Sequence, residues 1–147
     1  MKRKTYPPVY FISGFLLIIA CYFIFPLLNF IPFPINLSGI VVLASGFILV
    51  SKSYMLFQKN NTPHNFDTAT SLIEEGIFRY SRNPMYLGMV LILLGLGICF
   101  GNIISLIIPL IFFTIIHFVF IPIEEEMMGT LFKDSYEEYK RRVRKWI

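Results

Sequence analysis

The stretch SRNPMYLGMVLILLGLGICFGNIISLIIPLIFFTIIHFVFIPIEEE, residues 81–126, decides the fold of this chain. Between its basic first turn and its acidic end it has no Asp, Glu, Lys or Arg, and its apolar run is interrupted only by Gly101-Asn102. A run of that length with a central break is typical of two membrane spans joined by a tight turn. Both ends of such a hairpin emerge on the same side. We therefore expect Arg82 and the cluster Glu124-Glu125-Glu126 to be neighbours at one membrane face.

Two more apolar runs precede this hairpin, and the four together predict an all-helical integral membrane protein. The first two runs cover about residues 9–28 and 37–57, and the arms of the hairpin cover about 85–100 and 103–123. The first run is too long for the apolar region of a signal peptide and no small-residue cleavage site follows it, so we interpret it as a retained span. With 147 residues, the chain is expected to form a single membrane domain.

The distribution of charge predicts which side of the membrane each loop faces. The chain is 56% hydrophobic with a formal net charge of +4, whereas about 45–50% apolar residues is usual in soluble domains. Basic residues precede the first run, follow the second and follow the fourth, but the links 30–36 and 101–102 carry no charge. The positive-inside rule then predicts an inner (cytoplasmic) membrane protein with both termini and the middle loop in the cytoplasm. Positive charge that flanks spans favours contact with the bilayer and disfavours nucleic-acid binding.

The final segment, residues 131–147, has the pattern of an amphipathic helix. Basic side chains crowd one set of positions in its second half. Aromatic and apolar side chains recur at intervals of four and three residues, at Phe132, Tyr136, Tyr139, Val143 and Trp146. We expect this helix to lie on the cytoplasmic surface of the membrane.

The cysteine and histidine residues do not predict a metal site. Cys21 and Cys99 each lie inside an apolar run, where a buried thiol is expected, and no Cys–His cluster has the spacing of metal ligands. His117 lies inside the fourth run, seven residues before Glu124, so the two are expected on one helix face. Two interpretations of His117 stay open: a hydrogen bond to a neighbouring helix, or a role in lining a pocket or handling a proton.

Two motifs flank the hairpin. The first is SLIEEGIFRYSRNPMYLG, residues 71–88, with Thr62-Pro63 upstream, and the second is EEEMMGTLFKDSYEEY, residues 124–139. In order and spacing they resemble the core of the isoprenylcysteine carboxyl methyltransferase family and of the related phospholipid methyltransferases. The resemblance covers about residues 62–147. Asn83 stands where longer members carry His, as in small bacterial relatives, and Phe120 is near the place of an Arg that eukaryotic members carry for their substrate.

This resemblance implies methyl transfer from S-adenosylmethionine to a membrane-associated or amphiphilic small acceptor, in a pocket at the cytoplasmic membrane face. The acceptor stays open between a lipid amine, a thiol and a carboxylate. A carboxylate such as Glu124 suits the sulfonium cation or the ribose diol of the cofactor. The implied catalytic residues, which support the site, are Arg82 and Glu125. The implied cofactor-binding residues are Leu72, Ile73, Phe78, Asn83, Pro84, Met85, Tyr86 and Glu124.

Two other functions stay open on the sequence. One is a membrane reductase that uses a nicotinamide dinucleotide, because such proteins end in a similar helical arrangement. The other is a non-enzymatic membrane subunit whose loop and final segment dock a partner. Binding of S-adenosylmethionine, of a nicotinamide dinucleotide or of neither discriminates the three.

Overall fold

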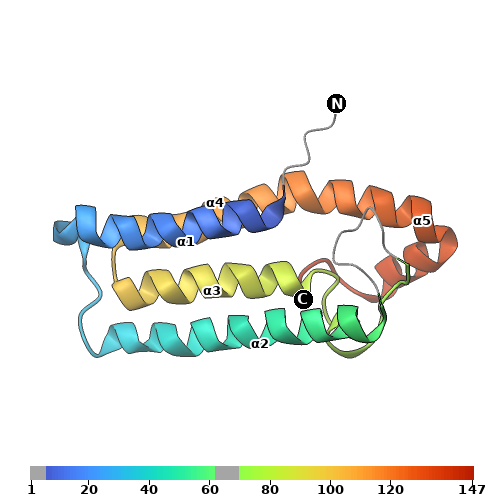
Figure 1. Cartoon of the computed structure of the whole chain (residues 1–147), viewed down its shortest axis with the longest axis horizontal. Helices are drawn as coiled ribbons and strands as arrows, with labels where there is room; N and C mark the ends of the chain where they lie inside the picture. The colour runs from blue at the N-terminus through green and yellow to red at the C-terminus, as the bar shows by residue number, and fades with distance from the viewer. Residues whose placement is uncertain (1–5, 62–69) are drawn as a thin grey trace.

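The computed structural model describes residues 6–61 and 70–147, and the regular secondary structure of this part of the chain is helical, with no strand (Figure 1). Thr62 and Pro63 of the sequence motif lie outside the described residues, as do the N-terminal bases Lys2, Arg3 and Lys4. The main helices are α1 (Pro7–Ile24), α2 (Ser38–Lys59), α3 (Pro84–Phe100), α4 (Ile103–Ile115) and α5 (Ile121–Arg142). Shorter segments are the 3₁₀ helices η1 (Pro26–Leu28), η2 (Ile35–Leu37) and η4 (Gly76–Arg79) and the π-helical η5 (Ile116–Phe120).

Within the described residues, three helical stretches are long and apolar enough to cross a membrane. They are α1, residues Ile35–Lys59, which include α2, and the continuous helix from α4 through α5. Helix α3 is also apolar but has only 17 residues. Large apolar side chains such as Leu17 on α1 and Leu110 on α4 are exposed, as expected of a surface that faces lipid. The all-helical membrane architecture predicted from the apolar runs is thus confirmed.

Helices α2 and α3 pack with their backbones in contact. A Cβ atom added to Gly46 would lie 2.6 Å from the carbonyl oxygen of Gly88, and one added to Gly39 would lie 2.5 Å from that of Gly95. Only glycine fits at such distances, so small residues let the two helices approach closely. The glycines of α2 therefore let it pack tightly against α3, and the contact of Gly46 with Gly88 holds the start of α3 in a fixed place.

The predicted hairpin turn between α3 and α4 is confirmed. Gly101 ends α3 in the left-handed conformation, with φ of 66°. The Asn102 side chain accepts a hydrogen bond from the backbone of Ile104 and donates to the Phe25 carbonyl and to the Asn29 side chain. Gly97 brings α3 close to α4, but Gly101 contacts the chain near residue 31 instead of helix α4. Gly97 therefore serves the packing of α3 on α4, and Gly101 serves the turn between these helices.

The end of the chain differs from the predicted surface helix over residues 131–147. Helix α5 bends at Lys133, where φ is 46° and ψ is −120°, and it ends at Arg142. The next residue, Val143, is extended, and residues 143–147 are not helical. The apolar face of α5 does not stand free: Tyr136 and Tyr139 are buried together with Val143 against the protein's own side chains. The other members of this cluster are Leu72, Met128 and Phe132.

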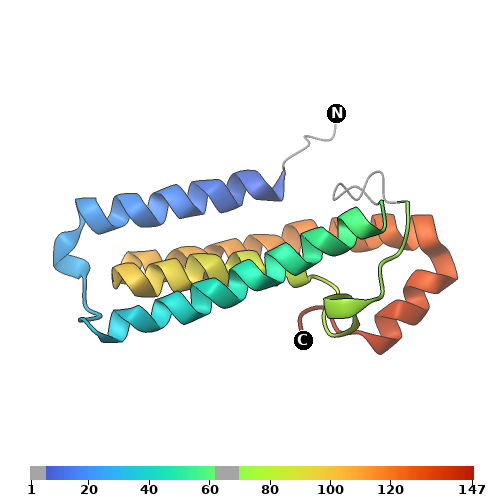
Figure 2. The same cartoon turned by 60° about the horizontal axis from the view of Figure 1, so that its bottom comes forward.

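The connections of the bundle separate into two ends. In both views, the α1–α2 and α3–α4 connections lie at one end of the molecule (Figures 1 and 2). The segment that follows α2, the start of α3, the bent helix α5 and the end of the chain gather at the other (Figure 2). The two separated sequence motifs therefore meet at this second end, which we call the loop end.

Candidate active site

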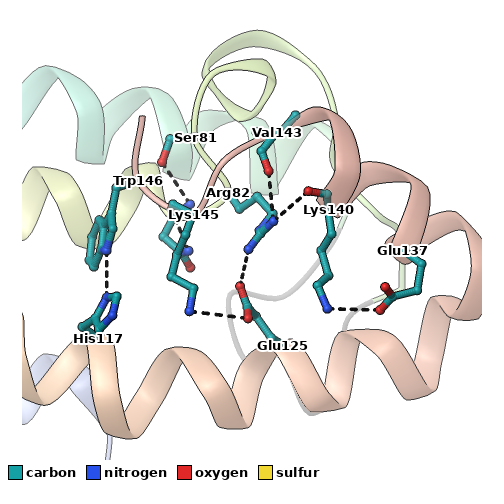
Figure 3. Close-up of polar contacts among 10 residues, drawn as sticks. Ser81, Arg82, His117, Glu125, Glu137, Lys140, Val143, Lys145 and Trp146 are labelled. Atoms are coloured by element: carbon teal, nitrogen blue, oxygen red, sulfur yellow. Dashed lines mark hydrogen bonds and ion pairs between the residues drawn. The ribbon is translucent and has the colours of Figure 1, made fainter.

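Arg82 makes hydrogen bonds at the loop end through both its backbone and its side chain. Its backbone N–H donates to the carbonyl of Arg144 at 3.0 Å. Its Nη1 donates to the carbonyls of Lys140 at 3.1 Å and Val143 at 2.9 Å (Figure 3). Because α5 ends at Arg142, the carbonyls of its last turn and of the residues after it need donors from elsewhere, and Arg82 supplies three of these donors. Arg82 thus joins the start of α3 to the end of the chain.

Asn83 continues this connection. Its Nδ2 donates to the carbonyl of Lys145 at 3.0 Å, and its backbone N–H donates to the hydroxyl of Ser81 at 3.1 Å. Pro84 follows as the first residue of α3 and is fully buried. Proline suits this position because its missing N–H would have no partner there. The turn is therefore fixed on both sides, by the helix start and by the end of the chain.

An ion pair links this turn to the acidic cluster. Arg82 Nη2 lies 2.6 Å from Glu125 Oε1, and the two side chains are only 10% and 19% exposed. Lys145 Nζ approaches the second oxygen of Glu125 at 3.7 Å (Figure 3). The predicted meeting of Arg82 with the acidic cluster is confirmed for Glu125. Arg82 would lose its carboxylate partner without Glu125, and Glu125 without Arg82 would keep only the longer contact with Lys145.

Glu124 is buried beside Tyr86 and keeps one oxygen unpaired. The Tyr86 hydroxyl donates to Glu124 Oε1, and both residues are buried. Glu124 Oε2 is buried without a hydrogen-bond partner among the described residues. Leaving a buried polar atom unpaired costs free energy, so such an atom in a native fold needs an explanation. A donor or cation from a bound ligand is the explanation that this chemistry favours.

A pocket of about 600 Å³ opens at the loop end, beside Val143, whose carbonyl accepts a hydrogen bond from Arg82. Two ion pairs lie at its rim: Arg142 Nη2 to Glu74 Oε2 at 2.6 Å, and Lys59 Nζ to Glu75 Oε1 at 2.9 Å. The hydrogen bond from the Lys59 ammonium holds the pKa of Glu75 below its ordinary value. The described residues that line the pocket are Asn60, Leu72, Ile73, Glu74, Glu75, Arg79, Tyr139, Arg142 and Val143.

The ten residues singled out by the resemblance fall into three groups. Leu72 and Ile73 line the pocket. Phe78 and Met85 pack beside Ile73 in a small core, where the rings of Phe78 and Phe57 lie 5.6 Å apart. The remaining six form the turn and the acidic cluster, and none of them is among the described pocket-lining residues: Arg82, Asn83, Pro84, Tyr86, Glu124 and Glu125. Val143 connects the pocket to the turn, because it lines the pocket and its carbonyl accepts a hydrogen bond from Arg82.

His117 accepts a hydrogen bond, but its partner differs from the neighbouring helix of the first interpretation. The donor is Trp146 Nε1 at 2.9 Å, which comes from the end of the chain and not from a neighbouring helix (Figure 3). His117 lies within the π-helical segment η5, which ends before the acidic cluster and changes the helical register between the two. His117 and Glu125, instead of Glu124, consequently point to segment 143–147 (Figure 3). The role of Trp146 had no signal in the sequence, since its spacing suited an amphipathic helix.

The geometry agrees with comparisons of the whole sequence. The sequence model of the phospholipid methyltransferase family matches residues 35–135, which include both halves of the cluster. The chain belongs to this family. The protein-S-isoprenylcysteine O-methyltransferase of Schizosaccharomyces pombe is 32% identical to this chain over 96 residues. The two matches confirm the family resemblance that the motifs predicted.

The relatives differ in length from this chain. The match to the Schizosaccharomyces pombe protein covers 63% of this chain but only 37% of that protein. An uncharacterized protein of Haemophilus influenzae is 36% identical over 63 residues, which are 43% of this chain and 100% of the relative. The family match therefore covers α2, α3, α4 and the acidic cluster, whereas α1 and segment 143–147 lie beyond the matched residues.

Proposed function

We propose that this protein transfers a methyl group from S-adenosylmethionine to a membrane-associated or amphiphilic small acceptor. The observation that carries the proposal is the unpaired oxygen of Glu124, buried at the point where the two family motifs meet. Family membership supports the reaction class. The proposal extends the family assignment to a cofactor, a site and an acceptor class.

The residues at the loop end fit such a cofactor. S-adenosylmethionine carries a sulfonium cation and a ribose diol, and Glu124 Oε2 is an acceptor that can pair with either. Leu72 and Ile73 provide an apolar wall for the adenine ring in a pocket of about 600 Å³. Phe78, Asn83, Pro84, Met85 and Tyr86 are assigned to shaping the binding turn. Arg82 and Glu125 support the site through their ion pair.

The cofactor, when bound, supplies an electrophilic methyl group, and displacement at that carbon needs no nucleophile from the protein. The chain's own residues hold the reactants in line and exclude water. Positioning of this kind contributes up to about 7–11 kcal/mol to a barrier in ideal cases. The burial of Tyr86 and Glu124 gives the dry surroundings in which an anionic acceptor and a cation react readily.

The membrane topology belongs to the same proposal. We propose four spans in one membrane domain, with α3 as the fourth in addition to the three long stretches, and with the loop end in the cytoplasm. The charge distribution supports this, since basic residues flank the loop end and the links 30–36 and 101–102 have none. A reporter fused after residue 147 is expected to be active in the cytoplasm, and activity only outside would contradict the proposed site.

The acceptor then enters from the bilayer, as an amphiphile, while the soluble cofactor enters from the cytosol. The test is a transfer assay with S-adenosylmethionine labelled on its methyl group. Purified protein is mixed with a total membrane lipid extract, and label is followed into the organic phase. Label transferred by the wild type, and not by Glu124→Ala, supports the proposal. Label confined to the aqueous phase for every lipid and prenylated thiol tested would contradict it.

A further inference from the structure

The last residues of the chain occupy the surface of the candidate site. Three successive backbone carbonyls of segment 143–147 accept hydrogen bonds from the turn before α3. Val143 and Arg144 accept from Arg82, and Lys145 accepts from Asn83. In addition, the Lys145 ammonium lies 3.7 Å from Glu125. Every one of these four contacts involves a residue of the Arg82-Asn83 turn or its ion-pair partner.

Trp146 anchors the same segment to the membrane helices. Its Nε1 donates to His117 Nδ1 at 2.9 Å, and its ring lies 4.8 Å from that of Phe113, centroid to centroid. The Trp146 and His117 rings are nearly parallel, 17° apart. Trp146 also packs against the central core of the bundle. By contrast, the next residue, Ile147, is 76% exposed. The anchor therefore ends at Trp146.

The anchor and the pocket belong to one short piece of chain. Val143 is buried and lines the pocket, and Trp146 is docked on α4 and η5 only three residues later. An extended chain spans at most about 3.3–3.6 Å per residue, so these few residues leave little slack. Displacement of Trp146 would therefore loosen the carbonyls that hold Arg82 and the pocket wall at Val143.

We propose that segment 143–147 is a strap that holds the Arg82-Asn83 turn in its binding geometry, and that His117 and Trp146 are positioning residues that lock this strap. Neither residue touches the pocket; both act through Val143, Arg82 and Asn83. The strap itself is a property of the fold. Its effect on cofactor affinity rests on the proposed function.

The chain offers a direct reporter of the strap, because Trp146 is its only tryptophan. Its fluorescence and its quenching by iodide are measured in detergent for the wild type and three variants. His117→Asn keeps an acceptor near the position of Nδ1, His117→Leu removes it, and Val119→Ala alters a side chain of the same segment that is 50% exposed. Circular dichroism shows that each variant retains its helices.

We expect His117→Leu to raise the iodide quenching constant of Trp146 at least about threefold and to shift its emission to the red, as for a ring released into water. His117→Asn and Val119→Ala are expected to match the wild type. Equal quenching in His117→Leu and the wild type would overturn the strap. So would a wild-type Trp146 that is quenched as readily as N-acetyltryptophanamide.

The positioning role has its own readout, the affinity for S-adenosylmethionine measured by calorimetry. His117→Leu and Trp146→Phe each lose one neutral hydrogen bond, so we expect an affinity about fivefold weaker, with rescue in His117→Asn. A released strap with unchanged affinity would overturn the positioning role but not the proposed function. If the wild type binds no S-adenosylmethionine, the proposed function fails and the fluorescence measurement still decides the strap.

Discussion

Two pairs of neighbouring helical elements in this protein are built in opposite ways. Helices α2 and α3 are regular and touch through glycine backbones, so that Gly46 and Gly88 have no room for even one further carbon atom. The line from α4 to α5 is interrupted by a π-helical segment and bends at Lys133. The regular pair forms a rigid support for the start of α3. In the irregular pair, the change of helical register alters the direction in which the following side chains point. Glu124 and Glu125 lie just after the interruption.

From this difference we expect substitutions in the two pairs to affect different properties, namely the stability of the fold and the binding of ligands. Substitutions in the α2–α3 contact should destabilise the fold without a specific effect on ligands. Substitutions after η5 should change binding, with a cost in stability only where a buried charge loses its partner. The following variants test this separation, from the largest expected effect to the smallest.

Arg82→Met should have the largest effect, because it breaks both the ion pair and the attachment of the last residues. Glu125 would keep only the Lys145 ammonium, at 3.7 Å, and the carbonyls of Lys140 and Val143 would lose their donor. We expect the free energy of unfolding to fall by about 3–5 kcal/mol. Thermal unfolding in detergent, followed by circular dichroism, measures it. The double variant Arg82→Met with Glu125→Leu should recover part of the loss, and a double variant as unstable as the sum of the two would contradict the pairing.

Gly46→Ala tests the rigid pair. The added Cβ would meet the Gly88 carbonyl oxygen at 2.6 Å and the Ile92 backbone nitrogen at 2.8 Å, so the helices must separate. We expect a loss of about 1–3 kcal/mol in the free energy of unfolding. The matched control is Gly129→Ala on α5, where a Cβ would meet only Tyr136, at 3.9 Å. That control should be neutral or stabilising, because alanine favours helix over glycine. Equal destabilisation of the two variants would refute the close contact.

Glu124→Ala tests the irregular pair, where function is expected to outweigh stability. Removal of the carboxylate takes away the acceptor proposed for the cofactor, so the affinity for S-adenosylmethionine should fall at least about tenfold, as for one charge-assisted hydrogen bond. Tyr86→Phe provides the control, since it keeps the ring and the carboxylate but removes the hydroxyl that donates to Glu124. Calorimetry on both gives the result. An affinity of Glu124→Ala equal to that of the wild type would remove this residue from the site.

The smallest effect is expected at the pocket rim, from the Lys59–Glu75 pair. The pKa of Glu75 is lowered in the folded protein by the hydrogen bond from Lys59. A lowered pKa contributes stability above the ordinary carboxyl pKa, and this contribution disappears as the pH falls through the folded value. Unfolding temperatures measured between pH 6 and pH 3 should therefore show a slightly steeper fall in wild type than in Lys59→Met. Parallel curves would show that the pair contributes nothing.

Much of the scaffold could be predicted from local patterns. The first three apolar runs predicted their helices within a few residues of their ends, and Gly101-Asn102 marked the turn between α3 and α4. The fourth run predicted where α4 begins, but the helix continues through η5 and α5 to Arg142, well beyond the predicted end near residue 123. The hairpin then required Arg82 and the acidic cluster to meet, and Arg82 pairs with Glu125. These predictions succeeded because length, apolarity and turn residues act within a few positions of the sequence.

The remaining features depend on contacts between distant residues. Residues 143–147 continue the helical spacing of the preceding turn, yet their carbonyls pair with donors on Arg82 and Asn83, about sixty positions earlier in sequence. The spacing of apolar residues does not show that these carbonyls bond to distant donors instead of continuing the helix. The π-helical segment likewise shifts the register between His117 and the acidic cluster, and an expected interval of seven residues cannot anticipate it. The roles of the ten site residues came from the family resemblance and stay predictions.

The central claim is that the loop end binds S-adenosylmethionine, and calorimetry on the wild-type protein in detergent tests it most directly. S-adenosylhomocysteine, which keeps the ribose and adenine but has no sulfonium, and NADPH serve as comparators. The account predicts saturable binding of the first two and none of NADPH. Binding of NADPH alone would indicate a reductase. A folded sample that binds none of the three would contradict the account and favour a non-enzymatic membrane subunit.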